Sequence, residues 1–165
     1  MAIARGSAHM PALGEHQRQE IGGELQATLV ELIDLSLLGK QFHWSVVGPL
    51  FRPLHLYLDE LIDSWRKAAD TVAERAVAIG FWPDGQSDTV AAGSGLTRVE
   101  RGAIEDRTLV RELVQRVAEV SERTRERMDR LSELDSASED VLVAVVRTLE
   151  EQLWMIRAQL EHERG

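Results

Sequence analysis

Hydrophobic residues recur every three or four positions along most of this chain, a spacing that predicts α-helices. The most regular stretch advances by alternating steps of four and three, which keeps one apolar stripe along a helix of about thirty residues. The stripe consists of Leu54, Leu58, Leu61, Trp65, Ala68, Val72 and Ala76. Three further helices are predicted from about 15 to 44, from about 104 to 134, and from the 135–138 turn to about 160.

Glycine, proline and serine mark the ends of these helices. Gly48-Pro49 ends the first helix, and the second begins near the same prolines, because first-turn amides have no acceptor inside a helix. The second helix is predicted to continue to Gly80, and a serine of the 135–138 turn is predicted to cap the last one. The Gly22-Gly23 pair weakens the early turns of the first helix.

A long connection separates the second helix from the third. It runs from about 81 to 102 and has room for one short helix around 88–92. Four long helices with one long crossover of this kind are typical of ferritin-like bundles. The expected fold class is therefore all-α: a ferritin-like four-helix bundle with a short helix in the connection between helices two and three.

The composition fits one ordinary globular domain. Of the 165 residues, 44% are hydrophobic and 28% are charged, and the absence of cysteine excludes thiolate metal sites and thiol catalysis. The formal charge of −9 has the wrong sign for a surface that grips a phosphate backbone. Charged residues interrupt every apolar run before it is long enough to span a membrane.

Residues 1–14 are expected to lie outside the bundle, which then covers residues 15–165. The opening ten residues lack the apolar core of a secretory signal, so the cytoplasm is the expected compartment, with association to the nucleoid left open. We interpret this opening as a flexible tail, part of which resembles a tag remnant.

Imidazole and carboxylate side chains form a candidate metal site. The candidates are His43, near the end of the first helix, and His55, Asp59, Asp70 and Glu74 on the second. These ligand types suit iron, manganese or zinc, and several carboxylates without sulfur suit redox-active iron. Taken singly, each histidine would more often be an ordinary partly buried residue, and each acid part of a solvated face.

The spacing of these residues predicts a site shared between two subunits. His55 and Asp59 are four apart, as are Asp70 and Glu74, so each pair shares one helix face. The two pairs are separated by about 22 Å of helix rise, whereas a metal–ligand bond is only about 2 Å long. One chain therefore cannot close the site, but a second copy lying antiparallel across a two-fold axis would bring the pairs together twice.

A run of residues around His43 resembles the signature of a known family. It reads KQFHWSVVGP from Lys40 to Pro49. Further matching positions are Phe51, Leu54-His55, Leu58-Asp59-Glu60, Asp70, Ala73-Glu74-Arg75-Ala76, Ser87-Asp88-Thr89 and Leu153-Trp154-Met155-Ile156-Arg157. From about Leu25 to Leu160 the chain resembles the Dps proteins, the mini-ferritins of starved bacterial cells. No Glu-x-x-His pair occurs, so the intrasubunit di-iron site of larger ferritins is not encoded.

The resemblance implies a hollow shell of twelve subunits that oxidises Fe(II), preferentially with hydrogen peroxide and more slowly with oxygen, and stores the ferric product as a mineral. It implies that His43, His55 and Asp59 of one subunit, with Asp70 and Glu74 of its two-fold mate, form the ferroxidase centre. Trp44 would lie beside this centre, where it would trap stray oxidising equivalents or simply pack.

Family members admit iron through pores near the start of the fourth helix, where this chain carries Asp135, Glu139 and Asp140. These acids would concentrate cations in a funnel, and the preference of acids for helix N-termini explains them equally well.

Two further hypotheses compete with the ferroxidase. The first is a nucleoid-organising DNA-binding assembly, and the second is a structural assembly without iron chemistry. Only two lysines occur, Lys40 and Lys67, both inside predicted helices, so strong direct DNA binding is not expected. The Arg123–Arg127 run alternates with acids, which is the pattern of a salt-bridged exposed helix.

Overall fold

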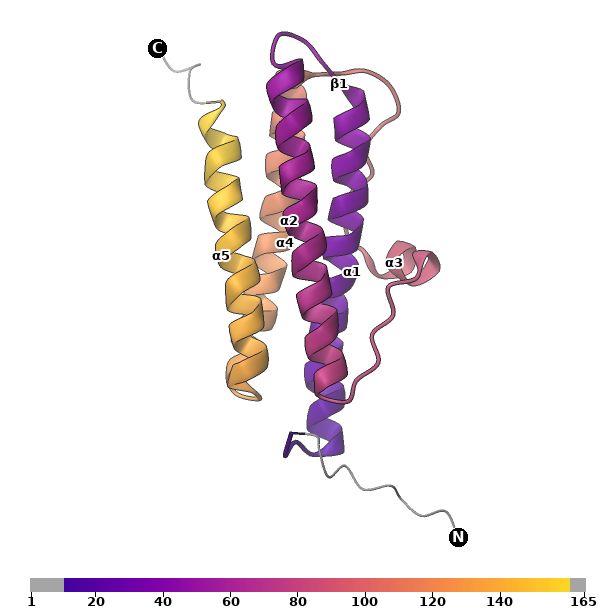
Figure 1. The fold of residues 1–165 in the computed structure, drawn as a ribbon, viewed down its shortest axis with the longest axis vertical. Coiled ribbons are helices and arrows are strands. Elements are labelled where there is room, and N and C mark those ends of the chain that lie inside the picture. The colour runs from indigo at the N-terminus through magenta and orange to yellow at the C-terminus, as the bar shows by residue number, and fades with distance from the viewer. Residues whose placement is uncertain (1–10, 161–165) are drawn as a thin grey trace.

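The computed structural model describes residues 11–160, and these residues form a bundle of four long helices with one short helix outside it (Figure 1). In chain order the elements are α1 (Glu15–Ser45), β1 (Val46–Val47), α2 (Phe51–Ala78), α3 (Ser87–Gly93), β2 (Ile104–Glu105), α4 (Asp106–Ser132) and α5 (Ser136–Ala158). The ferritin-like four-helix bundle expected from the pattern is confirmed.

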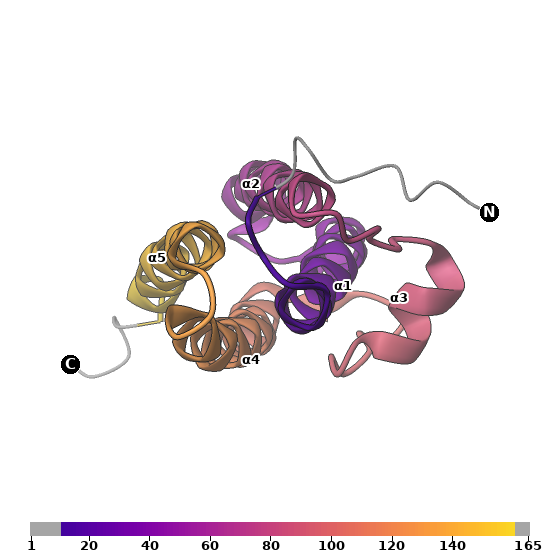
Figure 2. The ribbon, with the colours of Figure 1, turned by 90° about the horizontal axis from the view of Figure 1, so that it is seen from below.

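The bundle consists of two antiparallel hairpins, α1 with α2 and α4 with α5. The long crossover joins them and carries α3 along the outside of α1, as the end-on view in Figure 2 shows. Where the crossover reaches α4, Ile104–Glu105 pairs in parallel with Val46–Val47 beside the α1–α2 turn. Within residues 11–160, no helix is both long and apolar enough to cross a membrane.

The buried stripe of α2 is wider than the alternating pattern indicates. Ile62 and Ala69 are buried, whereas Ala68 is only partly buried at the edge of the core. The reason is that α2 packs against both α1 and α5, so its buried face extends beyond a single line of side chains. The buried residues of α2 are Leu54, Leu58, Leu61, Ile62, Trp65, Ala69, Val72 and Ala76.

Gly22 sits where another helix end approaches α1 closely. A Cβ at Gly22 would lie 2.1 Å from the Cδ2 atom of Phe81, the residue that follows the turn after α2. Nothing lies within 4 Å of the equivalent position at Gly23. The glycine pair therefore does not interrupt α1, which begins at Glu15 as predicted, and Gly22 makes room for the Phe81 ring.

The cap of α5 differs from the prediction. The capping residue is Asp135, not a serine, and its Oδ2 atom accepts hydrogen bonds from the Ser138 amide at 3.0 Å and the Ser138 hydroxyl at 2.5 Å. The same oxygen accepts a hydrogen bond from Nη2 of Arg75 at 2.7 Å, which ties the last turn of α2 to the first turn of α5. A carboxylate wins this position because it bonds the helix amide and an arginine at once.

Part of the arginine-rich run of α4 is buried, contrary to the exposed helix that the charge pattern indicates. Glu31 of α1 is 2% exposed and accepts hydrogen bonds from Arg123 at 2.5 Å and Arg127 at 2.7 Å. Arg125 alone of these three arginines forms an exposed pair, with Glu150. The sequence pattern missed this because the acid lies on a different helix, more than ninety positions away.

Of the predicted tail, residues 1–14, the structure describes only residues 11–14. Residues 1–10 lie outside the described part of the chain. Of the remaining four, Leu13 is half-buried and packs against the core just before α1 begins.

Candidate metal centre

His43 and His55, two of the predicted ligands, lie against each other at one end of the α1–α2 hairpin. His43 is in the last turn of α1 and His55 is in the second turn of α2, and the α1–α2 turn brings their imidazole rings into a stack. The ring centroids are 3.6 Å apart with an interplanar angle of 25°. Phe51, at the start of α2, packs against the His55 ring with 5.1 Å between ring centroids.

Each histidine holds the other through its backbone. Nδ1 of His43 lies 2.9 Å from the carbonyl oxygen of His55, and Nδ1 of His55 lies 3.0 Å from the carbonyl oxygen of His43. A carbonyl oxygen only accepts, so both Nδ1 atoms donate. In the neutral imidazoles the lone pair then resides on both Nε2 atoms, which is the state in which histidine binds a metal.

Asp59 lies next to this histidine pair but is held by a lysine. Its Oδ1 atom is 3.5 Å from Nδ1 of His43 and forms an ion pair and hydrogen bond with Nζ of Lys40. The hydrogen bond from Lys40 holds the pKa of Asp59 below its ordinary value, against a smaller opposing effect of burial. Asp59 is therefore an ionised carboxylate whose charge is already paired with the Lys40 ammonium.

Sequence reasoning gave Lys40 no role at this site. Its position three residues before His43 puts both side chains on one face of α1, which was the available signal. That Lys40 reaches Asp59 depends on how α1 packs against α2, a tertiary fact.

Asp70 and Glu74 do not join the histidines within one chain. Both are exposed on α2, and no group of three or more His, Cys, Asp or Glu side chains among residues 11–160 is placed to hold a metal ion. Asp70 instead lines a groove of about 390 Å³ between α1 and α2, beside Leu37, which is 58% exposed. The site shared with a second subunit remains a prediction.

Trp44 follows His43 directly and points away from the core. Its side chain is 72% exposed and belongs to an exposed apolar group at this end of the hairpin, with Val47, Leu50 and Phe51. So exposed an indole is not explained by packing within the chain. Whether Trp44 packs or traps oxidising equivalents depends on what surrounds it in an assembly.

The three candidate pore acids have different environments at the start of α5. Asp135 is occupied by its cap and by Arg75, as described above. Although burial raises the pKa of Asp135, hydrogen bonds from Ser138 and Arg75 hold it below the ordinary value. Glu139 is half-buried and Asp140 is exposed. Of the three, Asp140 is the most available to a passing cation.

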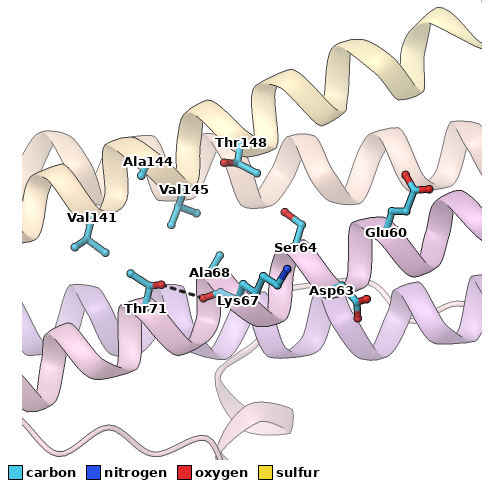
Figure 3. Close-up of a pocket in the computed structure, with 10 residues that line it drawn as sticks. All are labelled: Glu60, Asp63, Ser64, Lys67, Ala68, Thr71, Val141, Ala144, Val145 and Thr148. Atoms are coloured by element: carbon cyan, nitrogen blue, oxygen red, sulfur yellow. Dashed lines mark hydrogen bonds between the residues drawn. The ribbon is translucent and has the colours of Figure 1, made fainter.

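A larger groove lies between α2 and α5, away from the histidines (Figure 3). It measures about 560 Å³, and Glu60, Asp63 and Lys67 of α2 face it together with apolar residues of α5. None of the five predicted metal ligands lines this groove. The predicted ligands therefore lie outside this groove.

Comparison with known proteins decides the family. A ferritin-like domain matches residues 23–165. The DNA protection during starvation protein of Mycolicibacterium smegmatis is 33% identical over 158 residues, which cover 94% of this chain and 85% of that protein. The chain belongs to the Dps family. The resemblance based on the Lys40–Pro49 run is confirmed.

Other members of the Dps family support this assignment. DNA protection during starvation protein 2 of Deinococcus radiodurans is 31% identical over 153 residues, which cover 93% of this chain and 64% of that protein. The chain thus spans less than two thirds of that relative's length. A solved structure of Mycobacterium smegmatis Dps superimposes with a TM-score of 0.90 at 31% identity, covering 97% of each chain.

Proposed function

We propose that this chain oxidises Fe(II), preferentially with hydrogen peroxide and more slowly with oxygen, and stores the ferric product inside a dodecameric shell, thereby limiting oxidative damage. The observation that carries the proposal is the reciprocal bonding of His43 and His55. It directs both Nε2 lone pairs away from the backbone beside an ionised carboxylate, Asp59. Membership of the Dps family supports iron as the substrate.

Each proposed centre takes three ligands from one subunit and two from the partner subunit. His43, His55 and Asp59 would bind iron together with Asp70 and Glu74 of the partner subunit. The groove beside Asp70 and the exposed Leu37 supports this arrangement, since an apolar surface at this place suits a packed partner helix. The partner's carboxylates would also offset the positive charge that iron brings to this interface.

Each part of the site has a separate task in the oxidation. Imidazole nitrogens hold Fe(II), while carboxylate oxygens favour the harder Fe(III) product. Two ferrous ions each give up one electron, and peroxide takes both electrons and two protons to become two water molecules. Because the two electrons are accepted together, hydroxyl radical is not released. Lys40 must leave Asp59 when iron enters, so its ammonium competes with the metal for this oxygen.

The decisive experiment is complementation between two inactive variants. His55→Ala and Asp70→Ala chains are each expected to lose the absorbance increase that follows mixing with Fe(II) and hydrogen peroxide. Unfolded together and reassembled one to one, they should regain about one quarter of the wild-type activity, because half of the dimers are mixed and each mixed dimer keeps one intact centre.

A matched control is the mixture of His55→Ala with His43→Ala. Both changes affect the same half of the proposed centre, so no mixed dimer has an intact one and no activity should return. Equal recovery in both mixtures, or none in the first, would contradict the shared site. An inactive wild-type protein would contradict the ferroxidase itself.

Iron would reach the interior past the start of α5. We propose Glu139 and Asp140 as the acids that attract it, with Asp135 mainly holding the helix start in place. Asp140→Asn should slow iron uptake at low salt more than at high salt, because screening already weakens a long-range field.

A second candidate function is DNA binding, which the names of the starvation-protection relatives favour. The net charge of −9 and the presence of only two lysines oppose strong binding. A shell of many copies would multiply a weak affinity. A gel-shift titration at low and at physiological salt separates the two candidates, and no retardation at low salt would remove DNA binding.

A further inference from the structure

Asp106 is a buried carboxylate that the proposed iron chemistry does not use. It is the first residue of α4 and is only 2% exposed. Its Oδ2 atom accepts a hydrogen bond of 2.7 Å from the backbone amide of Leu50, which is fifty-six positions away and immediately precedes α2. This hydrogen bond lowers the pKa of Asp106, so the group is a carboxylate at neutral pH.

The backbone of the α1–α2 turn is shaped to admit this carboxylate. Gly48 has φ of +118°, a conformation that side-chain-bearing residues rarely adopt. A Cβ at Gly48 would also lie only 2.6 Å from Oδ2 of Asp106. Both the glycine conformation and the missing side chain are therefore needed for Asp106 to sit against the turn.

Strand pairing brings Asp106 to this place. Val46 pairs with Ile104 and Val47 with Glu105, so the residues just before Asp106 run parallel to the residues just after α1. The crossover thus ends by gripping the α1–α2 turn from outside the hairpin. Asp106 adds the hydrogen bond to the next part of that turn.

The gripped turn connects the two histidines. His43 is three residues before β1, and Leu50 is followed by Phe51, whose ring packs on His55. The histidines hold each other through backbone carbonyls and through their stacked rings, so their geometry depends on the relative placement of the end of α1 and the start of α2. Asp106 is the charged group that holds the start of α2 at its Leu50 amide.

We propose that Asp106 is a positioning residue for the iron site: through Leu50 and Phe51 it sets the orientation in which His55, stacked on His43, presents its Nε2 atom. The inference rests on the proposed function, because it assigns a support to the same site. Residues that support metal-binding histidines affect metal affinity by roughly tenfold to a hundredfold when removed. Asp106 acts one step further out, through the turn.

The test compares Asp106→Ala, Asp106→Asn and the neighbouring control Glu105→Gln, each checked for helix content and shell size. Fe(II) affinity is measured by anaerobic calorimetry, and KM and kcat by peroxide-driven oxidation. Asp106→Ala should raise KM about tenfold while lowering kcat much less. Asp106→Asn keeps an acceptor oxygen of the same shape and should retain most of the affinity. Glu105→Gln removes a neighbouring charge, keeps a side-chain oxygen that can accept from the Thr108 amide and does not contact Leu50, so it should behave as wild type.

Unchanged Fe(II) affinity in Asp106→Ala, with an active wild-type protein, would overturn this inference and leave the proposed function standing. An inactive wild-type protein would overturn both. If Asp106→Ala does not assemble, hydrogen exchange of the native protein decides: slow exchange of the Leu50 amide supports the clamp, and exchange at the rate of an open turn overturns it.

Discussion

At the scale of single residues, the polar side chains at and around the candidate site already have partners within the chain. His43 and His55 donate their Nδ1 hydrogens to carbonyl oxygens, which leaves the Nε2 lone pairs free for a ligand. Asp59 and Lys40 neutralise each other, and in our proposal iron displaces the lysine. Asp135 accepts a hydrogen bond from a helix amide, and Asp106 accepts one from a turn amide.

The first prediction concerns Lys40. Lys40→Ala should bind Fe(II) several-fold more tightly, because the metal no longer has to displace an ammonium group from Asp59. Anaerobic calorimetry measures the change. The control is Lys67→Ala, because Lys67 is the other lysine of the chain and lines the α2–α5 groove. This variant should leave the Fe(II) affinity unchanged. Weaker binding in Lys40→Ala than in Lys67→Ala would contradict the competition.

The second prediction concerns the cap of α5. Asp135→Ala should lower the free energy of unfolding by about 1–2 kcal/mol, since the first turn of α5 loses its cap and Arg75 loses its partner. Urea unfolding at matched protein concentration measures it. Ser136→Ala is the control, because Ser136 is the first residue of the same helix and does not serve as its cap.

The pH dependence of this contribution has a definite sign. The folded-state pKa of Asp135 is below its ordinary value of 3.8, so the stabilisation is present above that value and is lost as the pH falls through the folded-state pKa. The acid-induced loss of stability should therefore be smaller in Asp135→Asn than in wild type. An identical pH profile in the two proteins would show that Asp135 is not engaged in this way.

At the scale of helices, close packing of α1 against α2 depends on positions that have no side chain. Gly22 admits the Phe81 ring, and Gly39 lies where a Cβ would be 2.8 Å from both Ile62 and Trp65. The hairpin is therefore closely packed at two levels, at Gly39 along α2 and at Gly22 just beyond the end of α2. This contact keeps His43 and His55 in register, because any slide of α1 along α2 would separate the stacked rings.

The two adjacent glycines of α1 give a sharp test. Gly22→Ala should destabilise the protein by about 1–3 kcal/mol, because the new methyl group overlaps Phe81. Gly23→Ala, in open space on the same helix, should stabilise it by about 0.5–1 kcal/mol through reduced backbone freedom in the unfolded chain. Thermal unfolding of both variants measures the difference. The same sign of change in both would contradict this account of the helix contact.

At the scale of the whole molecule, the two hairpins are joined by buried charge as well as by apolar packing. Glu31 of α1 holds Arg123 and Arg127 of α4 under the crossover, while the opposite α1–α2 face carries the predicted ligands and exposed apolar side chains. One side of the hairpin is thus completed by its own chain. The other side, in our proposal, is completed by a second copy.

The last prediction concerns that second copy. Leu37→Glu should produce assemblies smaller than wild type by light scattering and should lose peroxide-driven iron oxidation, because a charge replaces an apolar side chain that the partner would bury. Leu37→Met keeps the apolar volume and should assemble normally. A full-sized, active Leu37→Glu shell would place the interface elsewhere.

What the amino-acid sequence determines by itself is local. Apolar spacing is a property of one helix at a time, so it predicted all four long helices, the short helix near 88–92 and most of the core. Ligand spacing likewise placed His55 with Asp59, and Asp70 with Glu74, on shared helix faces. The same short-range pattern around Lys40–Pro49 identified the family.

What only the tertiary structure decided are the contacts between segments far apart in the chain. These contacts are hydrogen bonds between different parts of the fold: Lys40 with Asp59, Arg127 with Glu31, Arg75 with Asp135, and the Leu50 amide with Asp106. Polar residues in a sequence do not reveal their partners, because a hydrogen bond depends on positions within a few tenths of an ångström that packing alone sets. The wider buried stripe of α2, with Ala69 in place of Ala68, has the same origin: two neighbouring helices, not one, define its face.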